Sequence, residues 1–234
     1  MKLPRLYAIL DTAFFRDASA MFAAAEGLAA AGCTLIQCRN KSGNAREMLE
    51  QARELKRRFA AHLELRYGGA DALVRPAASQ NPLRTGASGT PQSVRLIMND
   101  RADLCLAAEF DGVHVGQDDL SPESVRKIIG PDRWLGVSTH NPEQLREADL
   151  TSADYLAIGP VFATSSKENP DSVVGLEGVR RARTLTRKPL VAIGGITRAN
   201  AASVIEAGAD SVAVISDLLR DPRRSAEEFF RVLR

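Results

Sequence analysis

The sequence predicts an α/β fold, a single-domain (β/α)8 barrel spanning residues 1–234. Eight short apolar runs alternate with stretches of helical spacing along nearly the whole chain. Each run has about five residues and is rich in Val, Ile and Leu, as expected of parallel strands buried on both faces. The length of 234 residues is close to the ~250 residues typical of this barrel.

The expected elements follow one another in a regular order. The strands are expected at residues 6–10, 34–38, 95–98, 112–115, 134–137, 155–158, 190–193 and 211–215. Helical spacing of alanine, leucine and charged residues is clear at 18–31, 45–62 and 198–207. A doubly wound open sheet is the competing fold, but it usually has a glycine-rich turn after its first strand, and residues 10–13 contain no glycine.

Residues 68–93 interrupt the alternation between the second expected helix and the third expected strand. Gly, Pro, Ala, Ser and Thr dominate this segment, a composition typical of flexible loops. It is too short to form a domain, so we expect a flexible insertion in one barrel.

Composition excludes several classes of protein. The 31 Lys and Arg residues nearly balance 29 Asp and Glu, without the basic stripe typical of nucleic-acid binding. No run of about 20 apolar residues is present, and the first residues lack a signal-peptide pattern. Three cysteines without ligand-like spacing favour neither a disulfide framework nor a zinc site. We expect a cytoplasmic protein that binds small molecules and neither nucleic acid nor a membrane; a homo-oligomer is compatible with the sequence.

Three long polar side chains end the second expected strand, where a parallel barrel places its active site. Gln37, Arg39 and Lys41 occupy alternate positions, so the two-residue period of a strand places them on one side. Together they suit a multiply charged anion, whose oxygens arginine binds in a bidentate manner. The alternative is a solvated strand end, which suits Lys41 better than the other two because unpaired polar groups in a buried sheet are costly.

Two carboxylates follow neighbouring expected strands. Asp100 ends the third strand beside Asn99, and Asp119 lies in the loop after the fourth. Such hard oxygen ligands suit Mg²⁺, which usually takes one or two carboxylates and completes its shell with water and phosphate. Helix capping is the alternative for each carboxylate, with Asp119 capping a helix that begins near Ser121. His114 is interpreted as a core histidine without a functional role.

The loops after the later strands add hydroxyls and glycines to the same face. Ser138 ends the fifth strand, and a long loop after the sixth contains three hydroxyl residues, 164–166, followed by Lys167. Glycines at 194–195 and the pair 215–216 follow the last two strands, the usual phosphate site of this barrel. Two anion sites and one candidate metal site, without an apparent nucleophile and adjacent base, suit a reaction in which a metal assists the departure of pyrophosphate.

Six blocks of the sequence resemble the thiamine-phosphate synthase family in order and spacing. They are Gln37-x-Arg39-x-Lys41, Asn99-Asp100-Arg101, the 112–120 segment GVHVGQDDL, Gly136-Val137-Ser138, the 159–167 segment GPVFATSSK and the 192–196 segment AIGGI. The resemblance covers most of the chain outside the insertion. It implies a transferase of thiamine biosynthesis that joins 4-amino-2-methyl-5-hydroxymethylpyrimidine pyrophosphate to 4-methyl-5-(2-phosphoethyl)thiazole, forming thiamine phosphate and pyrophosphate.

The resemblance also implies a role for each site residue. The pyrimidine pyrophosphate would contact Gln37, Cys38, Arg39, Asn40, Lys41, Asn99, Ser138 and Lys167. The thiazole phosphate would contact Thr164, Ser165, Ser166, Gly195, Ile215 and Ser216. Asp100 and Asp119 would hold Mg²⁺, and the catalytic residues would be Arg39, Lys41, Ser138 and Lys167. The sequence departs from the family at Ser166, where threonine is common, at the unusual Cys38 and Asn40, and in the length of 68–93.

The implied chemistry agrees with the residues present. Loss of pyrophosphate leaves a pyrimidine cation that the ring amino group stabilises, so the protein must chiefly stabilise the departing charge. The thiazole nitrogen attacks with a lone pair and loses no proton, so no general base is needed. One alternative on the same barrel is a thiazole tautomerase-like isomerase, which would not need Asp100, Asp119 and Lys167 together. The other is a non-catalytic phosphate-binding regulator, which would release no pyrophosphate. Fold analogy alone does not separate the three.

Overall fold

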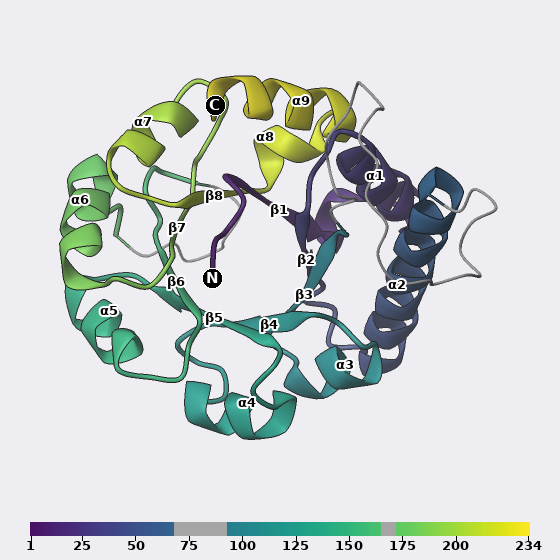
Figure 1. The fold of residues 1–234 in the computed structure, drawn as a ribbon, viewed down its shortest axis with the longest axis horizontal. Coiled ribbons are helices and arrows are strands. Elements are labelled where there is room, and N and C mark those ends of the chain that lie inside the picture. The colour runs from purple at the N-terminus through teal and green to yellow at the C-terminus, as the bar shows by residue number, and fades with distance from the viewer. Residues whose placement is uncertain (68–92, 165–171) are drawn as a thin grey trace, which may run out of the picture.

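Eight parallel strands close into a barrel in the computed structural model, which describes residues 1–67, 93–164 and 172–234. Each strand pairs with the next along the chain, and the last pairs with the first, as the central ring of Figure 1 shows. The strands are β1 (Leu6–Asp11), β2 (Leu35–Arg39), β3 (Arg95–Asn99), β4 (Gly112–Val115), β5 (Trp134–Thr139), β6 (Tyr155–Ile158), β7 (Leu190–Ile193) and β8 (Ser211–Val214). The predicted fold class is confirmed, with strand ends that differ from the expected ones by no more than two residues.

Helices surround the barrel on its outside (Figure 1). They are α1 (Ala18–Ala30), α2 (Ala45–Tyr67), α3 (Ala102–Ala107), α4 (Pro122–Ile129), α5 (Pro142–Asp149), α6 (Gly175–Leu185), α7 (Ala201–Glu206), α8 (Ser216–Leu219) and α9 (Pro222–Val232), with a 3-10 turn η1 (Thr12–Phe14) after β1. Helix α9 packs against α1 and so closes the outer ring. None of the helices in the described ranges is long and apolar enough to cross a membrane.

Local sequence signals set the helix ends. The Ser121 hydroxyl accepts a hydrogen bond from the amide of Ser124 at 3.3 Å, and a proline follows as the first residue of α4. Asn141 caps α5 in the same way, with its side chain 2.9 Å from the amide of Gln144. A polar cap followed by proline is a strong start signal because the cap side chain accepts from an open amide of the first turn, and proline has no amide hydrogen that needs a partner. Asp119 therefore does not cap α4, and that alternative is wrong.

The apolar side chains form two layers, as the alternation of strand residues dictates. The outer layer lies between the strands and the helices and holds most of the buried residues. The inner layer fills the barrel and includes two buried tyrosines, Tyr7 and Tyr155, among aliphatic neighbours such as Ile97 and Val191. The inner tyrosines carry hydroxyls into the barrel, and each therefore needs a hydrogen-bond partner there.

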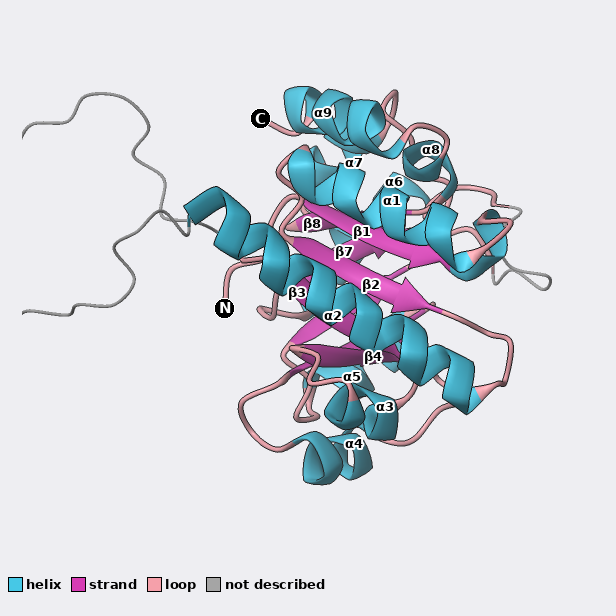
Figure 2. Ribbon diagram, turned by 90° about the vertical axis from the view of Figure 1, so that its right-hand side faces the viewer, coloured by secondary structure: helices cyan, strands magenta, loops and turns pink. Residues whose placement is uncertain are grey.

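All strands point the same way, so the barrel has two different faces. In Figure 2 the arrows of β1 and β2 point away from the end where the N-terminus lies. Helix α2 ends at Tyr67 and β3 begins at Arg95, both at the face that carries the N-terminus, because each βα unit returns there. Of the predicted insertion 68–93, residues 68–92 lie outside the described part of the chain.

Candidate active site

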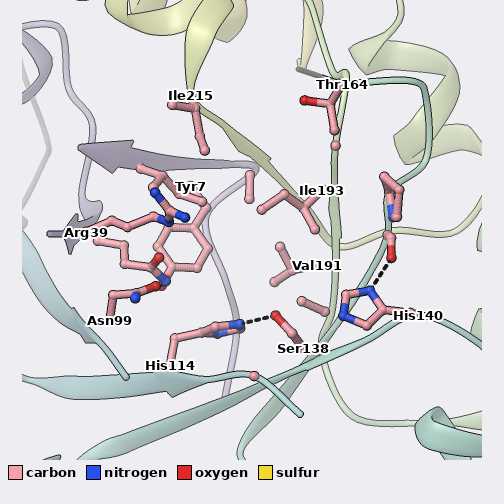
Figure 3. A pocket seen from close by; sticks show the side chains of 18 of the residues that line it. Tyr7, Arg39, Asn99, His114, Ser138, His140, Thr164, Val191, Ile193 and Ile215 are labelled. Carbon is pink, nitrogen blue, oxygen red and sulfur yellow. Dashed lines mark hydrogen bonds between the residues drawn. The ribbon is translucent and has the colours of Figure 1, made fainter. Parts of the chain in front are cut away.

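A cavity of about 460 Å³ opens at the carboxyl ends of the strands, within the range of small-molecule sites, roughly 300–1,000 Å³. Figure 3 shows its side chains converging from opposite sides of the barrel. The predicted site residues that line it are Gln37, Arg39, Lys41, Asn99, Asp100, Asp119, Ser138, Thr164, Gly195, Ile215 and Ser216. The predicted Ser165, Ser166 and Lys167 lie outside the described residues.

Two predicted substrate contacts, Cys38 and Asn40, do not line the cavity. Cys38 is buried in the outer apolar layer, and burial raises the pKa of its thiol to about 12. Asn40 is buried as well, and its amide donates to Gln51 of α2 at 2.9 Å. Both alternate with the cavity-lining residues and face the helices, so the prediction that they contact substrate is corrected to a structural role.

The two cations of the second strand end are each held by a carboxylate. Arg39 forms an ion pair with Asp11, the buried last residue of β1. The register of the sheet places these two residues side by side on neighbouring strands. Lys41 pairs with Asp100 across the cavity mouth. Sequence reasoning missed Asp11, which fixes the arginine in the orientation that faces the cavity.

Asp100 stands in an unusual backbone conformation and a crowded electrostatic setting. Its φ of 62° lies in the left-handed region, which is uncommon for residues other than glycine and is concentrated at functional sites. Burial raises the pKa of Asp100, the neighbouring Asp119 carboxylate adds to that rise, and Lys41 opposes it. Asp119 accepts a hydrogen bond from the amide of Gly116 at 2.7 Å. Asp100 therefore lies close enough to Asp119 for the two carboxylates to repel one another, and Lys41 offsets that repulsion in part.

The side-chain amide nitrogen of Asn99 has no hydrogen-bond partner among the described residues. Its side-chain Nδ2 is the one buried polar side-chain atom without a hydrogen-bond partner among the residues described. The residue is 7% exposed and lines the cavity. A buried donor without a partner carries a desolvation cost of about 1–3 kcal/mol, so this amide is placed to donate to a ligand.

A chain of hydrogen bonds crosses the floor of the cavity. Gln37 Nε2 donates to the hydroxyl of Tyr7 at 2.9 Å, and the hydroxyls of Tyr7 and Tyr155 lie 3.0 Å apart. The Tyr155 hydroxyl lies 3.1 Å from Nδ1 of His114, whose Nε2 lies 2.8 Å from the hydroxyl of Ser138 (Figure 3). Five strands, β1, β2, β4, β5 and β6, contribute one residue each.

The floor residues are held in their neutral forms. Burial lowers the pKa of His114 to about 4, and the charge of Asp119 opposes this only in part. Burial also raises the pKa of Tyr7 and of Tyr155 well above the usual tyrosine value. The interpretation of His114 as a core histidine without a role misses its contact with Ser138. Strand alternation could have indicated this contact, because it places His114 on the inward face of β4, which lines the cavity.

The opposite wall is built from backbone that only glycine permits. Gly194 and Gly195, after β7, have φ angles of 98° and 63°. A Cβ on Gly195 would lie 2.6 Å from the carbonyl oxygen of Ala163, so a side chain cannot fit there. Thr164 and Ser216 line the same side of the cavity. Bared amides and hydroxyls after the last strands suit a phosphate group.

The fold and the site define a (β/α)8-barrel protein whose mouth has basic and polar side chains on one wall and a glycine turn with hydroxyls on the other. A family model described as "Thiamine monophosphate synthase" matches residues 83–218, more than half of the chain. The thiamine-phosphate synthase of Koribacter versatilis (strain Ellin345) is 53% identical over 100% of this chain and 97% of its own. That of Chloroflexus aurantiacus is 40% identical over 91% of this chain and 83% of its own.

A solved structure leads to the same family. The thiamine phosphate pyrophosphorylase from Pyrococcus furiosus superposes with a TM-score of 0.73 and 31% identity, covering 98% of this chain and 95% of its own. The chain belongs to the thiamine-phosphate synthase family. It is a transferase of thiamine biosynthesis, as the sequence blocks predicted.

Proposed function

We propose that this chain joins 4-amino-2-methyl-5-hydroxymethylpyrimidine pyrophosphate to 4-methyl-5-(2-phosphoethyl)thiazole, releases pyrophosphate and requires Mg²⁺. The observation that carries the proposal is the pair of anion-binding walls in one cavity. Arg39, Lys41 and the unpartnered amide of Asn99 lie on one wall, and the Gly194–Gly195 turn with Ser216 lies on the other. One wall suits a diphosphate and the other a monophosphate, so two phosphorylated substrates would meet between them.

The residues present fit a magnesium ion. Asp100 and Asp119 both line the cavity and interact directly, and burial together with the charge of Asp119 raises the pKa of Asp100. No group of three or more His, Cys, Asp or Glu suited to a metal occurs among the described residues. Two carboxylates are enough for Mg²⁺, which usually binds through one or two of them and through substrate phosphates rather than a full protein cage. When bound, the ion would neutralise charge on the leaving pyrophosphate.

The protein's own groups supply charge and position. Arg39 and Lys41 would bind oxygens of the pyrophosphate, and their charge stabilises the leaving group as its carbon–oxygen bond breaks. The thiazole nitrogen then attacks the pyrimidine cation with its lone pair, so no proton has to be removed. The neutral His114, with its low pKa, is consistent with a site that needs no general base. Holding the two substrates face to face supplies the rest of the rate.

Pyrophosphate release is the direct test. The assay follows pyrophosphate with each substrate alone, with both, and with both after Mg²⁺ is removed by a chelator. We expect release only when both substrates and Mg²⁺ are present. Asp100→Asn should abolish release at ordinary Mg²⁺ while the protein stays folded. Near-normal activity of that variant in the presence of chelator would contradict the metal role.

The same assay separates the alternatives. A thiazole tautomerase-like isomerase would convert the thiazole phosphate without using the pyrimidine, and a phosphate-binding regulator would bind without turnover. Either result would refute the proposed condensation. The cytoplasmic location, the absence of nucleic-acid and membrane partners, and the number of subunits stay predictions.

A further inference from the structure

The hydrogen-bond chain on the cavity floor has a direction that follows from its donors. The Gln37 amide nitrogen has only hydrogens to give, so the Tyr7 oxygen accepts from it at 2.9 Å. Tyr7 then has one hydrogen to donate, and the Tyr155 oxygen at 3.0 Å is its partner. The later links follow if each buried hydroxyl donates its single hydrogen to the next group in the chain.

The direction continues to the other side of the barrel. Tyr155 accepts from Tyr7, so its own hydrogen goes to Nδ1 of His114 at 3.1 Å. That nitrogen must therefore lack a hydrogen, and a neutral imidazole then carries its hydrogen on Nε2. Nε2 donates to the Ser138 oxygen at 2.8 Å. The hydroxyl hydrogen of Ser138 is left to point into the cavity.

We infer that Tyr7, Tyr155 and His114 are positioning residues that fix Gln37 as a hydrogen-bond acceptor and Ser138 as a donor toward the bound pyrimidine. One of the two amide hydrogens of Gln37 is donated to Tyr7, which fixes the orientation of the amide and leaves its carbonyl oxygen as the acceptor for the ligand. The inference rests on the proposed function, in which the pyrimidine binds at this end of the cavity.

The chemical consequence is a preference for one pattern of ligand groups. An acceptor oxygen from Gln37 matches an exocyclic amino group, and a donor from Ser138 matches a ring nitrogen or a phosphate oxygen. A 4-oxo ring would place an oxygen against the Gln37 oxygen and leave the buried groups unpaired. Mismatches of this kind cost more than the loss of one hydrogen bond. The floor would therefore select a 4-amino pyrimidine before any bond breaks.

Packing around the chain leaves little freedom for another arrangement. The His114 and Tyr155 rings lie 5.5 Å apart between centroids, and the Tyr7 and Tyr155 rings meet edge to face at 6.1 Å. His114 is 8% exposed, and Tyr7 and Tyr155 are at most 1% exposed. Because water has little access to the tyrosine hydroxyls, each must satisfy its hydrogen bond within the chain.

The first test measures the tautomer of His114 in the substrate-free protein by ¹⁵N NMR. The sequence has three histidines, so His114→Asn assigns the signal by its loss. We expect a protonated Nε2 and an unprotonated Nδ1. A protonated Nδ1 would mean that the chain runs from Ser138 to Gln37 and would overturn the inference. This measurement uses no substrate, so it stands apart from the proposed function.

The second test measures binding of two unreactive ligands, 4-amino-2-methyl-5-hydroxymethylpyrimidine and its 4-oxo analogue. The wild type should bind the amino compound at least about tenfold more tightly. Tyr155→Phe cuts the chain and should bring that ratio close to one.

Thr139→Val is the matched control. It also removes a buried hydroxyl, which donates to the Ala157 carbonyl at 2.8 Å on the outer side of β5, and it should lower stability while the ratio stays unchanged. A folded Tyr155→Phe protein with the wild-type ratio would refute the inference. Failure of the wild type to bind either ligand, with the expected tautomer present, would instead count against the proposed function.

Discussion

Gly136 makes the contact between His114 and Tyr155 possible, and Gly136→Ala tests how much the floor depends on it. In the sheet, Gly136 of β5 stands opposite His114 on one side and Tyr155 on the other. A Cβ there would lie 2.1 Å from Cζ of Tyr155 and 2.4 Å from Nδ1 of His114. Carbon atoms in contact sit about 3.5–4.0 Å apart, so both rings would have to move and their 3.1 Å hydrogen bond would break.

The expected cost follows from those two effects. Forcing a methyl group into a packed core costs about 1–3 kcal/mol, and leaving a buried polar group unpaired costs about 1–3 kcal/mol. We therefore expect Gly136→Ala to lower the free energy of unfolding by about 2–6 kcal/mol and the Tm by roughly 4–24 °C. Ligand binding should weaken too, because the Ser138 hydroxyl loses the support of His114.

Denaturant unfolding and calorimetry measure this cost against a matched glycine. Gly27 lies within α1, and a Cβ there would meet nothing closer than Arg223 Cβ at 3.5 Å. Gly27→Ala should therefore gain about 0.5–1 kcal/mol, because alanine loses less backbone entropy in a helix. If Gly136→Ala proves as stable as Gly27→Ala and binds ligand normally, the packing argument for the floor is wrong.

Three further predictions concern pH, an insertion and a lysine. The pKa of His114 is about 4 in the folded protein against 6.5 unfolded, so on acidification the unfolded state takes up a proton first. The free energy of unfolding should therefore fall by about 3 kcal/mol as the pH drops from 6.5 to 4. Unfolding curves of His114→Asn should lack this pH-dependent loss. Replacing residues 69–92 by a short Gly-Ser connector should leave kcat/KM within about threefold of the wild-type value, since Tyr67 and Arg95 flank the segment on the face opposite the cavity. A hundredfold loss of kcat/KM in a folded deletion variant would place the segment near the substrate. Lys167, which lies outside the described residues, is predicted to stabilise the charge of the departing pyrophosphate. Lys167→Ala should therefore lower kcat. A change only in the KM for the thiazole phosphate would assign this lysine to the other substrate.

The barrel and most of its mouth could be predicted because both depend on local patterns. Short apolar runs mark strands buried on both faces, and the ends of such strands meet at one face of a parallel barrel. The two-residue period of a strand therefore places Gln37, Arg39 and Lys41 together at the cavity. The same period places Cys38 and Asn40 on the other side of the strand, where they face α2 and the outer apolar layer. Neighbouring residues of one motif point to opposite sides of a strand, so only alternate residues of the motif can reach the substrate.

The partners across the barrel could not be predicted because they depend on register and closure. Tyr7 and Tyr155 are separated by 148 positions in sequence and meet only once the sheet has closed. Asp11 faces Arg39 because of the register between β1 and β2, which the intervening loop and helix do not determine. The position of His114 on the inward face of β4 follows from strand alternation, but the hydroxyls that contact its ring come from β5 and β6 and could not be predicted.

The site separates charge from neutral recognition by depth, and the separation has a physical reason. Arg39 and Lys41 lie at the mouth with side chains 23% and 55% exposed, where water lowers the cost of keeping a charge without a ligand. The floor is buried, and its tyrosine hydroxyls and imidazole stay neutral because burial disfavours the charged form of each group. Substitutions at the floor should therefore change which ring is bound and how stable the barrel is, whereas substitutions at the mouth should change how fast pyrophosphate leaves.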